Sequence, residues 1–481
     1  MTTNPNTSYT LTINGKGANS QETFRVVNPA TEEALAEAPD ASRGQLDEAV
    51  LAARHAYPSW KATPIGERQA LVRQLGERIA VEAEGLAKLL TSEQGKPQHE
   101  ARAEIASAVH WLREISKLAP PVEVVSEDAD RRVETRHVPI GVIGAIAPWN
   151  FPVALAIWKI APALVAGNTV VLKPSPFTPL TTLRLGELTR DLFPAGVVNV
   201  LSGSDRLGPW ITEHQDIDKI SFTGSTQTGK AIMRSAAVNL KRITLELGGN
   251  DPAIVLPDAD LDEVVPRLFW SAFGNNAQIC VATKRLYVHE AIYDRFAQSF
   301  VDYARGVRTG DGSLPGIQLG PVQNKLQFDR VSKLLANARA SSVRFLIGGE
   351  VPAGKGYFVP VSIADNPPDD NPVVAEEAFG PVLPLLKYSD VDEVVRRAND
   401  SMYGLAASVW GQDIDNAQSV ADRLDAGTVW INTSQEMSPL FGFGGHKQSG
   451  MGVENGLAGL LEYTNPQTVV IRRKFRPLPA H

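Results

Sequence analysis

One cysteine and one glutamate have the chemistry needed for covalent catalysis. Cys280 is the only cysteine among 481 residues, and it follows a polar turn of small residues, GNNAQ, after a predicted helix over residues 261–273. Glu246 ends an alternating apolar segment just before Gly248 and Gly249, where a ligand could approach the backbone closely. A nucleophilic thiol needs a group that handles protons, and a carboxylate can do so. By type alone, a lone cysteine is more often a small buried apolar residue, and a strand glutamate more often faces solvent.

The segment 147–152, APWNFP, could assist such chemistry from the end of a predicted strand. Its prolines restrict the backbone on both sides of Asn150 and so fix the direction of the amide. A rigid N–H donor beside a nucleophile can stabilise an oxyanion. A purely structural Pro-Asn turn is the alternative interpretation.

Two further segments have features of a nucleotide site. The predicted strand over residues 169–173 ends in KPSP, and ligands bind at the carboxyl ends of parallel strands. The segment 221–230, SFTGSTQTGK, joins a strand to a helix whose first N–H groups and dipole favour a phosphate. Its glycine and lysine spacing also resembles a P-loop, but Ala231 stands where a P-loop NTPase needs Ser or Thr for magnesium.

Composition excludes several classes of protein. A hydrophobic share of 43% and a charged share of 21% are typical of a globular protein, and the length predicts two or three compact units. The net charge of −7 gives no basic excess for nucleic acid or an anionic membrane. The most apolar stretch, residues 138–172, is interrupted before it reaches the roughly 18–20 apolar residues of a membrane span.

The remaining compositional signals concern location and metals. A single cysteine permits no intrachain disulfide, and the N-terminal MTTNPNTSYTLTING has no signal-peptide or transit-peptide character, so we expect a cytoplasmic protein. The eight histidines have no metal-ligand spacing, and we predict no metal.

The elements that position these groups follow a clear order. Helical periodicity covers residues 43–56, 65–82 and 86–117, whereas the acidic segment 120–136 reads as a projecting strand or a linker. From residue 140 to 237 short apolar strands alternate with helices, and a second series of this kind runs from 253 to 432. Such alternation predicts an α/β fold with two doubly wound parallel sheets.

The motifs taken together resemble the aldehyde dehydrogenase superfamily, of the NAD(P)-dependent, hydrolytic, non-CoA-acylating type. NPAT at 28, APWNFP, FTGST, ELGG with Cys280 at 34 positions after Glu246, EEAFGP at 376 and FGGHKQSG at 443 occur in the family's order. The resemblance implies a Rossmann-like cofactor domain over residues 1–117 and 137–248 and a catalytic domain over 249–448. It further implies a small β arm for oligomerisation over 118–136 and 464–475.

The same resemblance assigns catalytic roles. Cys280 would attack the aldehyde, Asn150 and the Cys280 N–H would bind the oxyanion, and Glu246 would deprotonate the water that hydrolyses the thioester. Lys159 and Glu454 match positions proposed to relay that proton, although both could be ordinary charges. The implied partner is a small aldehyde, and the implied assembly is a homodimer or homotetramer.

The implied cofactor is NAD or NADP. Glu377 would contact the nicotinamide ribose and Phe379 the nicotinamide ring. NAD-selective members of the family often carry a glutamate where this chain has Pro176, so the choice between the two cofactors stays open. The full set of implied contacts is Trp149, Lys173, Ser175, Gly224, Ser225, Thr226, Gly229, Leu247, Glu377 and Phe379.

The residues that the resemblance places along the substrate tunnel are apolar or aromatic: Phe151, Leu155, Trp158, Ile279, Val281, Met437 and Phe443. They favour a hydrophobic aliphatic or aromatic aldehyde, and a carboxylated semialdehyde is the alternative. The family's usual proline is Gly442 here, which could loosen the loop near the tunnel. A CoA-acylating enzyme would generally lack Glu246, and a non-catalytic nucleotide-binding protein would not need Cys280, Glu246 and Asn150 together.

Overall fold

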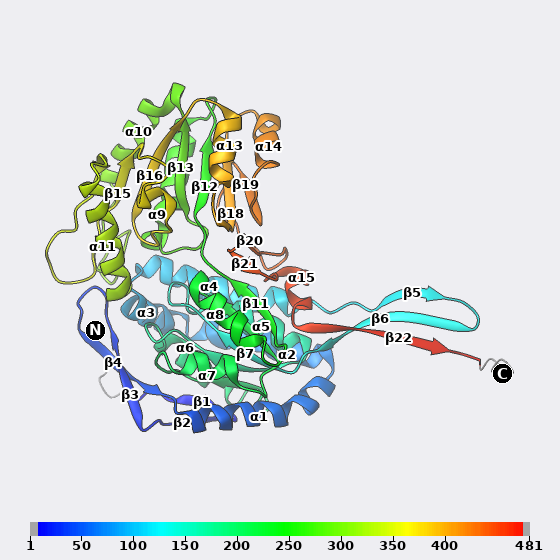
Figure 1. Ribbon diagram of the computed structural model, residues 1–481. Coiled ribbons are helices and arrows are strands. Elements are labelled where there is room, and N and C mark those ends of the chain that lie inside the picture. Colours follow the sequence, from blue (N-terminus) through cyan, green and yellow to red (C-terminus); the bar gives the residue numbers. More distant parts are fainter. Residues whose placement is uncertain (1–7, 475–481) are drawn as a thin grey trace.

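Two large sheets with helices on their faces form the body of the protein (Figure 1). The computed structural model describes residues 8–474. The first sheet has eight strands in the order β2-β1-β9-β8-β7-β10-β11-β21, and the second has seven in the order β14-β15-β16-β13-β12-β18-β19. The central strands of each sheet run parallel. The predicted fold class, with two doubly wound α/β sheets, is confirmed.

The first sheet contains β1 (Leu11–Ile13), β2 (Lys16–Ala18), β7 (Val142–Ile146), β8 (Thr169–Lys173), β9 (Val198–Val200), β10 (Lys219–Thr223), β11 (Arg242–Glu246) and β21 (Gly450–Met451). The associated helices are α1 (Arg43–Ala62), α2 (Ile65–Val81), α3 (Ala83–Gln94), α4 (Gln98–Ile115), α5 (Ala154–Ala166), α6 (Leu180–Thr189), α7 (Leu207–Glu213), α8 (Thr226–Ala236) and α15 (Gly456–Leu461). A separate hairpin joins β3 (Glu22–Val27) to β4 (Ala34–Asp40).

The second sheet contains β12 (Asp251–Val255), β13 (Thr283–His289), β14 (Phe345–Ile347), β15 (Ser362–Asp365), β16 (Val382–Tyr388), β18 (Ala406–Trp410) and β19 (Thr428–Ile431). Its helices are α9 (Leu261–Phe273), the 3₁₀ turn η1 (Gly274–Ala277), α10 (Glu290–Arg305), α11 (Lys325–Ala340), α12 (Pro372–Ala375), α13 (Val391–Asn399) and α14 (Ile414–Ala421). The short strand β17 (Tyr403–Gly404) pairs with β20 (His446–Lys447). Along β12, Ile254 faces one apolar cluster and Val255 the other, so the sheet is buried on both faces.

A third, small sheet projects from the body (Figure 1). It consists of β5 (Glu123–Glu127), β6 (Arg131–Pro139) and β22 (Thr464–Arg472), with β6 in the middle. Every residue of β5 is exposed. Of the predicted arm, residue 475 lies outside the described residues, as do residues 1–7 of the predicted cofactor domain.

Two features depart from the sequence prediction. The single helix predicted over 86–117 is two helices, because the chain turns at Gly95, whose φ is 96°, and then meets Pro97. Strand β13 was missed because Lys284 and Arg285 interrupt its apolar pattern. Both are buried, and their charged groups donate to backbone carbonyl oxygens. Among residues 8–474, no helix combines the length and the apolar character that a membrane crossing needs.

Helix α5 depends on a carboxylate from α4. All of its residues are buried, and its N-terminus has no side-chain cap of its own. Glu104 Oε1 accepts hydrogen bonds from the backbone N–H groups of Val153 (2.9 Å) and Ala154 (3.1 Å). Glu104 Oε2 lies 2.6 Å from Lys96 Nζ, and both of these side chains are fully buried. Helix α5 is therefore capped by one half of a buried ion pair.

We expect the substitution Glu104→Leu to reduce the free energy of unfolding by about 3–5 kcal/mol, because it leaves the Lys96 ammonium buried without its counter-ion. Chemical denaturation followed by circular dichroism measures this loss. Glu84→Leu is the matched control, since Glu84 pairs with Arg102 on the surface, where ion pairs contribute little. Equal stability of the two variants would contradict the role given to Glu104.

Candidate active site

The loop that carries Cys280 is strained and firmly held. The backbone φ values of Asn275–Ala277 are 48°, 55° and 61°, a left-handed conformation that non-glycine residues rarely adopt in succession. Gln278 stabilises this turn: its Nε2 donates to the Asn275 carbonyl (2.9 Å), and its Oε1 accepts from the backbone N–H of Gln323 (2.8 Å). The loop thus presents Cys280 from a fixed backbone.

The Cys280 thiol has an environment that opposes ionisation. The residue as a whole is partly exposed, yet protein surrounds the sulfur, and this burial raises the pKa of the thiol to about 12. The Lys284 ammonium acts in the opposite direction, whereas the carboxylates of Asp251, Glu246 and Glu377 raise the pKa further. Without a ligand the thiol is therefore protonated at neutral pH, and nucleophilic chemistry requires removal of that proton.

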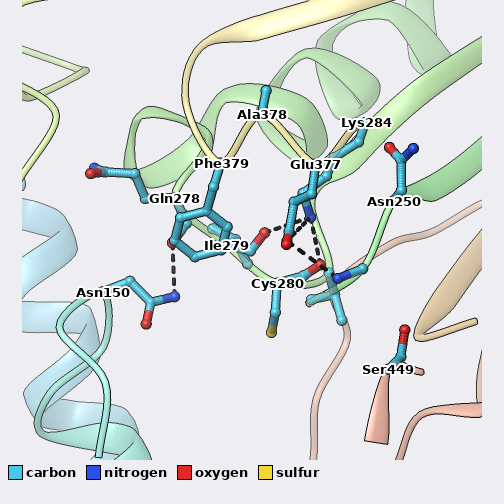
Figure 2. A network of polar contacts seen from close by, with 12 residues as sticks. Asn150, Asn250, Gln278, Ile279, Cys280, Lys284, Glu377, Ala378, Phe379 and Ser449 are labelled. Atoms are coloured by element: carbon cyan, nitrogen blue, oxygen red, sulfur yellow. Dashed lines mark hydrogen bonds and ion pairs between the residues drawn. The ribbon is translucent and has the colours of Figure 1, made fainter. Parts of the chain in front are cut away.

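Asn150 contacts the Cys280 loop directly. It follows β7, is 4% exposed, and its side-chain Nδ2 donates to the Gln278 carbonyl oxygen at 2.9 Å (Figure 2). The backbone carbonyl oxygen of Asn150 accepts from Lys96 Nζ (3.0 Å) and from Asn275 Nδ2 (3.1 Å). The Gln278 carbonyl thus orients the side-chain amide, and Lys96 and Asn275 hold the backbone that carries it. Because an amide nitrogen carries two N–H donors, one of them is available to a ligand.

Glu246 is a buried carboxylate without a hydrogen-bond partner. It ends β11, as predicted, and is 3% exposed, and neither of its oxygens is paired within residues 8–474. Burial raises its pKa well above the usual range, Glu454 raises it further, and the Lys159 ammonium lowers it. An unpaired buried carboxylate with a raised pKa is unfavourable for stability and is typical of a functional acid or base.

Lys159 and Glu454 form a buried ion pair close to Glu246. Lys159 Nζ, on α5, lies 2.5 Å from Glu454 Oε1 and 2.7 Å from the hydroxyl of Thr223. Lys159 is fully buried and Glu454 is 2% exposed. The two predicted relay residues are therefore brought together, and both act electrostatically on Glu246.

The start of α8 has the form of a phosphate site. Ser225 caps the helix by accepting from the Thr228 N–H at 3.2 Å. Gly229 is required for packing, because a Cβ there would lie 2.6 Å from a methyl carbon of Leu247. The predicted Gly224, Ser225 and Thr226 stand at the first turn of this helix, which follows β10.

Lys173 is the last residue of β8, which β7 separates from β10 in the sheet, and Ser175 follows it. Burial lowers the pKa of the Lys173 ammonium to about 8, and the carboxylates of Asp205 and Asp40 oppose this shift. Leu201 N donates to the Leu172 carbonyl at 2.9 Å, so the ends of β8 and β9 lie side by side and bring the loop that contains Asp205 near Lys173.

Glu377, Phe379 and Trp149 meet next to the Cys280 loop. Glu377 Oε1 accepts from the Gly249 N–H at 3.2 Å, and a Cβ at Gly248 would lie 2.2 Å from Glu377 Oε2. Only glycine at 248 permits this approach. The Phe379 ring meets the Trp149 ring edge-on, with their centroids 5.3 Å apart.

The predicted tunnel residues share one apolar cluster with Cys280. Leu155, Trp158, Val281 and Phe443 are buried, and Phe151, Ile279 and Met437 are partly buried against them. The Trp158 ring stacks on Trp111, with their centroids 5.5 Å apart, and meets Phe443 edge-on at 6.1 Å. Trp111 was not predicted as a site residue, because in the sequence it has the pattern of an ordinary apolar position of a helix.

Four charged and polar residues that hold the site were not predicted from the sequence: Lys96, Glu104, Gln278 and Lys284. The one available signal was a charged residue within an otherwise apolar or turn segment, and such a signal does not identify its partner. Within residues 8–474, no three histidine, cysteine, aspartate or glutamate side chains are placed to share a metal ion.

Two doubly wound sheets, a helix start suited to phosphate and a thiol in electrostatic contact with a buried carboxylate indicate an α/β enzyme that binds a nucleotide. Residues 17–469 match the aldehyde dehydrogenase family. A probable aldehyde dehydrogenase of a Pseudomonas species is 44% identical over 470 residues, which cover 97% of this chain and 95% of that protein.

Solved structures agree with this match. The NAD⁺ complex of aldehyde dehydrogenase from Bacillus cereus has a TM-score of 0.95 and 39% identity, with 98% of each chain covered. Betaine aldehyde dehydrogenase from Staphylococcus aureus in complex with NAD⁺ has a TM-score of 0.94 and 32% identity, with 98% of this chain and 96% of that chain covered. The chain belongs to the aldehyde dehydrogenase family and is an NAD(P)-dependent aldehyde dehydrogenase.

Proposed function

We propose that this aldehyde dehydrogenase oxidises a hydrophobic aliphatic or aromatic aldehyde to the carboxylic acid through covalent intermediates on Cys280. The observation that carries the proposal is Glu246, a buried carboxylate without a partner in electrostatic contact with the thiol of Cys280. A carboxylate in this state can accept a proton from the thiol or from a water. That capacity favours hydrolysis over transfer of the acyl group to CoA.

The covalent step begins when the Cys280 thiolate attacks the aldehyde carbon and forms a C–S bond. The carbonyl π electrons move to oxygen, and the free N–H of Asn150 with the Cys280 N–H stabilises the resulting oxyanion. Such a donor contributes about 3–4 kcal/mol in comparable sites. Loss of a hydride from the same carbon restores the carbonyl as a thioester.

Glu246 completes the reaction as a general base. It takes a proton from a water, the resulting hydroxide adds to the thioester carbon, and the C–S bond breaks to release the acid and the Cys280 thiolate. Because burial raises the pKa of Glu246, its basic form increases as pH rises, and we expect the rate of hydrolysis to increase with it. We propose that the pair of Lys159 and Glu454, which acts electrostatically on Glu246, receives the proton from it.

The residues present fit a bound NAD or NADP. The first turn of α8 would hold the pyrophosphate, Lys173 and Ser175 the adenosine ribose, and Glu377 the second ribose next to Phe379 and Trp149. The nicotinamide supplies a hydride acceptor. Pro176 leaves room for either cofactor, but the carboxylates of Asp205 and Asp40 near Lys173 would repel a 2′-phosphate, and we propose NAD as the preferred cofactor.

The substrate class follows from the apolar cluster around Cys280. The predicted tunnel residues in this cluster are all apolar or aromatic, so a carboxylated aldehyde would lose hydration along them without gaining an ionic partner from them. An aliphatic chain or an aromatic ring would instead gain the free energy of apolar burial and could stack on Trp158. A semialdehyde dehydrogenase is the alternative, and it would need an arginine from another part of the fold.

The projecting sheet supports a further proposal on assembly, in which the chain forms a homodimer or homotetramer through this arm. Within residues 8–474, the outer strands β5 and β22 each have one unpaired edge, and this sheet carries four exposed apolar side chains: Val124, Val125, Val470 and Ile471. We further propose that residues 1–117 and 137–248 form the cofactor domain and that residues 249–448 form the catalytic domain. We also propose a cytoplasmic location.

The variant Glu246→Gln should give one burst of reduced nicotinamide per active site and then stall, because the thioester forms but its hydrolysis loses the general base. We expect its steady-state rate to fall by about 10²–10⁴-fold, and Cys280→Ala to give neither burst nor turnover. Stopped-flow absorbance with octanal and NAD measures both. Glu263→Gln, on the exposed face of α9, is the control. Steady turnover by Cys280→Ala would refute the role of Cys280 as nucleophile.

The proposed preference for NAD is tested by the same rates measured with each cofactor. A higher kcat/KM with NADP than with NAD would refute it.

Octanal and benzaldehyde should show a kcat/KM at least about tenfold above that of succinic semialdehyde, because the apolar lining does not compensate the loss of carboxylate hydration. Trp158→Ala should lower kcat/KM for benzaldehyde more than for acetaldehyde, since only the ring loses a stacking partner. Initial rates across this panel measure the ranking. A preference for succinic semialdehyde would favour the alternative function.

Light scattering at micromolar concentration should give the mass of two or four chains. Val470→Asp should shift the distribution toward smaller species, because it places a charge on the exposed apolar face of β22. A monomeric wild-type protein would contradict the proposed assembly.

A further inference from the structure

Lys284 is a buried cation directly behind the proposed nucleophile. It lies near the start of β13, and its side chain is 6% exposed. Its ammonium nitrogen donates to the carbonyl oxygens of Cys280 (2.6 Å) and Ile279 (2.9 Å), and it lies 3.5 Å from Glu377 Oε1 (Figure 2). The reaction proposed above makes no use of this group.

Packing stability does not explain a lysine at this position. Burial of an ammonium costs several kcal/mol, and an apolar side chain of similar volume is often as good or better for stability. The partners of Lys284 are two neutral carbonyls and one carboxylate at ion-pair rather than hydrogen-bond distance. Apolar packing alone therefore does not account for a charge at this position.

The contacts of Lys284 orient the backbone of the nucleophile. The Ile279 carbonyl and the Cys280 N–H belong to one planar trans peptide, in which they point in opposite directions. By holding that carbonyl, Lys284 directs the Cys280 N–H away from itself. Figure 2 shows the Cys280 sulfur on the side away from the ammonium, so the cation leaves the reacting face open.

The positive charge of Lys284 opposes the negative charges around the Cys280 thiol. The charged groups that face the thiol are Lys284 and the carboxylates of Asp251, Glu246 and Glu377. Of these four groups, Lys284 is the one that carries positive charge. In a buried site, where charges interact strongly, it is the group that can offset the three carboxylates when the thiolate forms.

We propose that Lys284 is a positioning residue that fixes the Cys280 peptide through its two carbonyl contacts and supplies the positive charge that the thiolate needs. This inference rests on the proposed role of Cys280 as nucleophile. It concerns the thiol in the protein without cofactor, so it can be tested apart from turnover.

The test is alkylation of the cofactor-free protein by iodoacetamide, followed by mass spectrometry. Cys280 is the only cysteine of the chain, so each adduct reports on it alone. At pH 9 we expect Lys284→Met to lower the second-order rate by about tenfold or more, and Lys284→Arg to stay within about threefold of wild type. Lys333→Met, at an exposed position of α11, should react at the wild-type rate.

A second variant separates the effect of charge from damage to the fold. Burial raises the pKa of Asp251 to about 7, so this carboxylate is ionised at pH 9 and Asp251→Asn removes a negative charge. We expect Asp251→Asn to increase the alkylation rate, opposite in sign to Lys284→Met. A merely structural role would slow both variants. If Lys284→Met does not fold, as judged by circular dichroism, Lys284→Arg and Asp251→Asn still provide the test.

A wild-type alkylation rate in Lys284→Met, or slower alkylation in Asp251→Asn, would overturn the inference. The expected alkylation pattern in a protein that oxidises no aldehyde would instead support the role of Lys284 while refuting the proposed function. The two failures are therefore distinguishable.

Discussion

The cost of forming a thiolate inside the protein is the constraint on which the rest of the site depends. Burial around Cys280 favours the neutral thiol, and the neighbouring carboxylates favour it further. Three side chains hold the backbone around Cys280 in one conformation. A strained turn held by Gln278 sets the backbone, Lys284 contacts that backbone from behind, and Asn150 reaches it from the first sheet.

The two sheets supply these groups for a topological reason. Parallel strands place their carboxyl ends at one edge, so β7, β8, β10 and β11 end next to one another and deliver Asn150, Lys173, the α8 turn and Glu246 to one region. The second sheet adds the Cys280 loop just before β13. Because the nucleophile and the candidate base come from different sheets, the site exists only when the sheets are packed together.

Much of this arrangement was predictable from sequence, and the unpredicted part has a common cause. Strand and helix alternation gave the two sheets, and Glu246 at a strand end and Cys280 after α9 lie where the local pattern placed them. The pattern failed at Lys284 and Arg285, because a buried charge on a strand looks like an exposed one until its partners are known. Lys96 and Glu104 were missed similarly: they lie eight positions apart, but Lys96 stands in the break between α3 and α4, where helical spacing does not apply.

A thiol that is difficult to ionise has an advantage in an enzyme that works on reactive carbonyl compounds. Oxidation and unwanted alkylation both proceed through the thiolate, so a raised pKa protects the resting Cys280. The same burial also makes each added charge effective, because interactions weaken less in a low dielectric than in water. A single proton accepted by Glu246 removes one of the three carboxylate charges that face the sulfur and leaves Lys284 less opposed. In the proposed mechanism, proton transfer to Glu246 thus both generates the thiolate and improves its surroundings, and this couples the proposed general base to the proposed nucleophile.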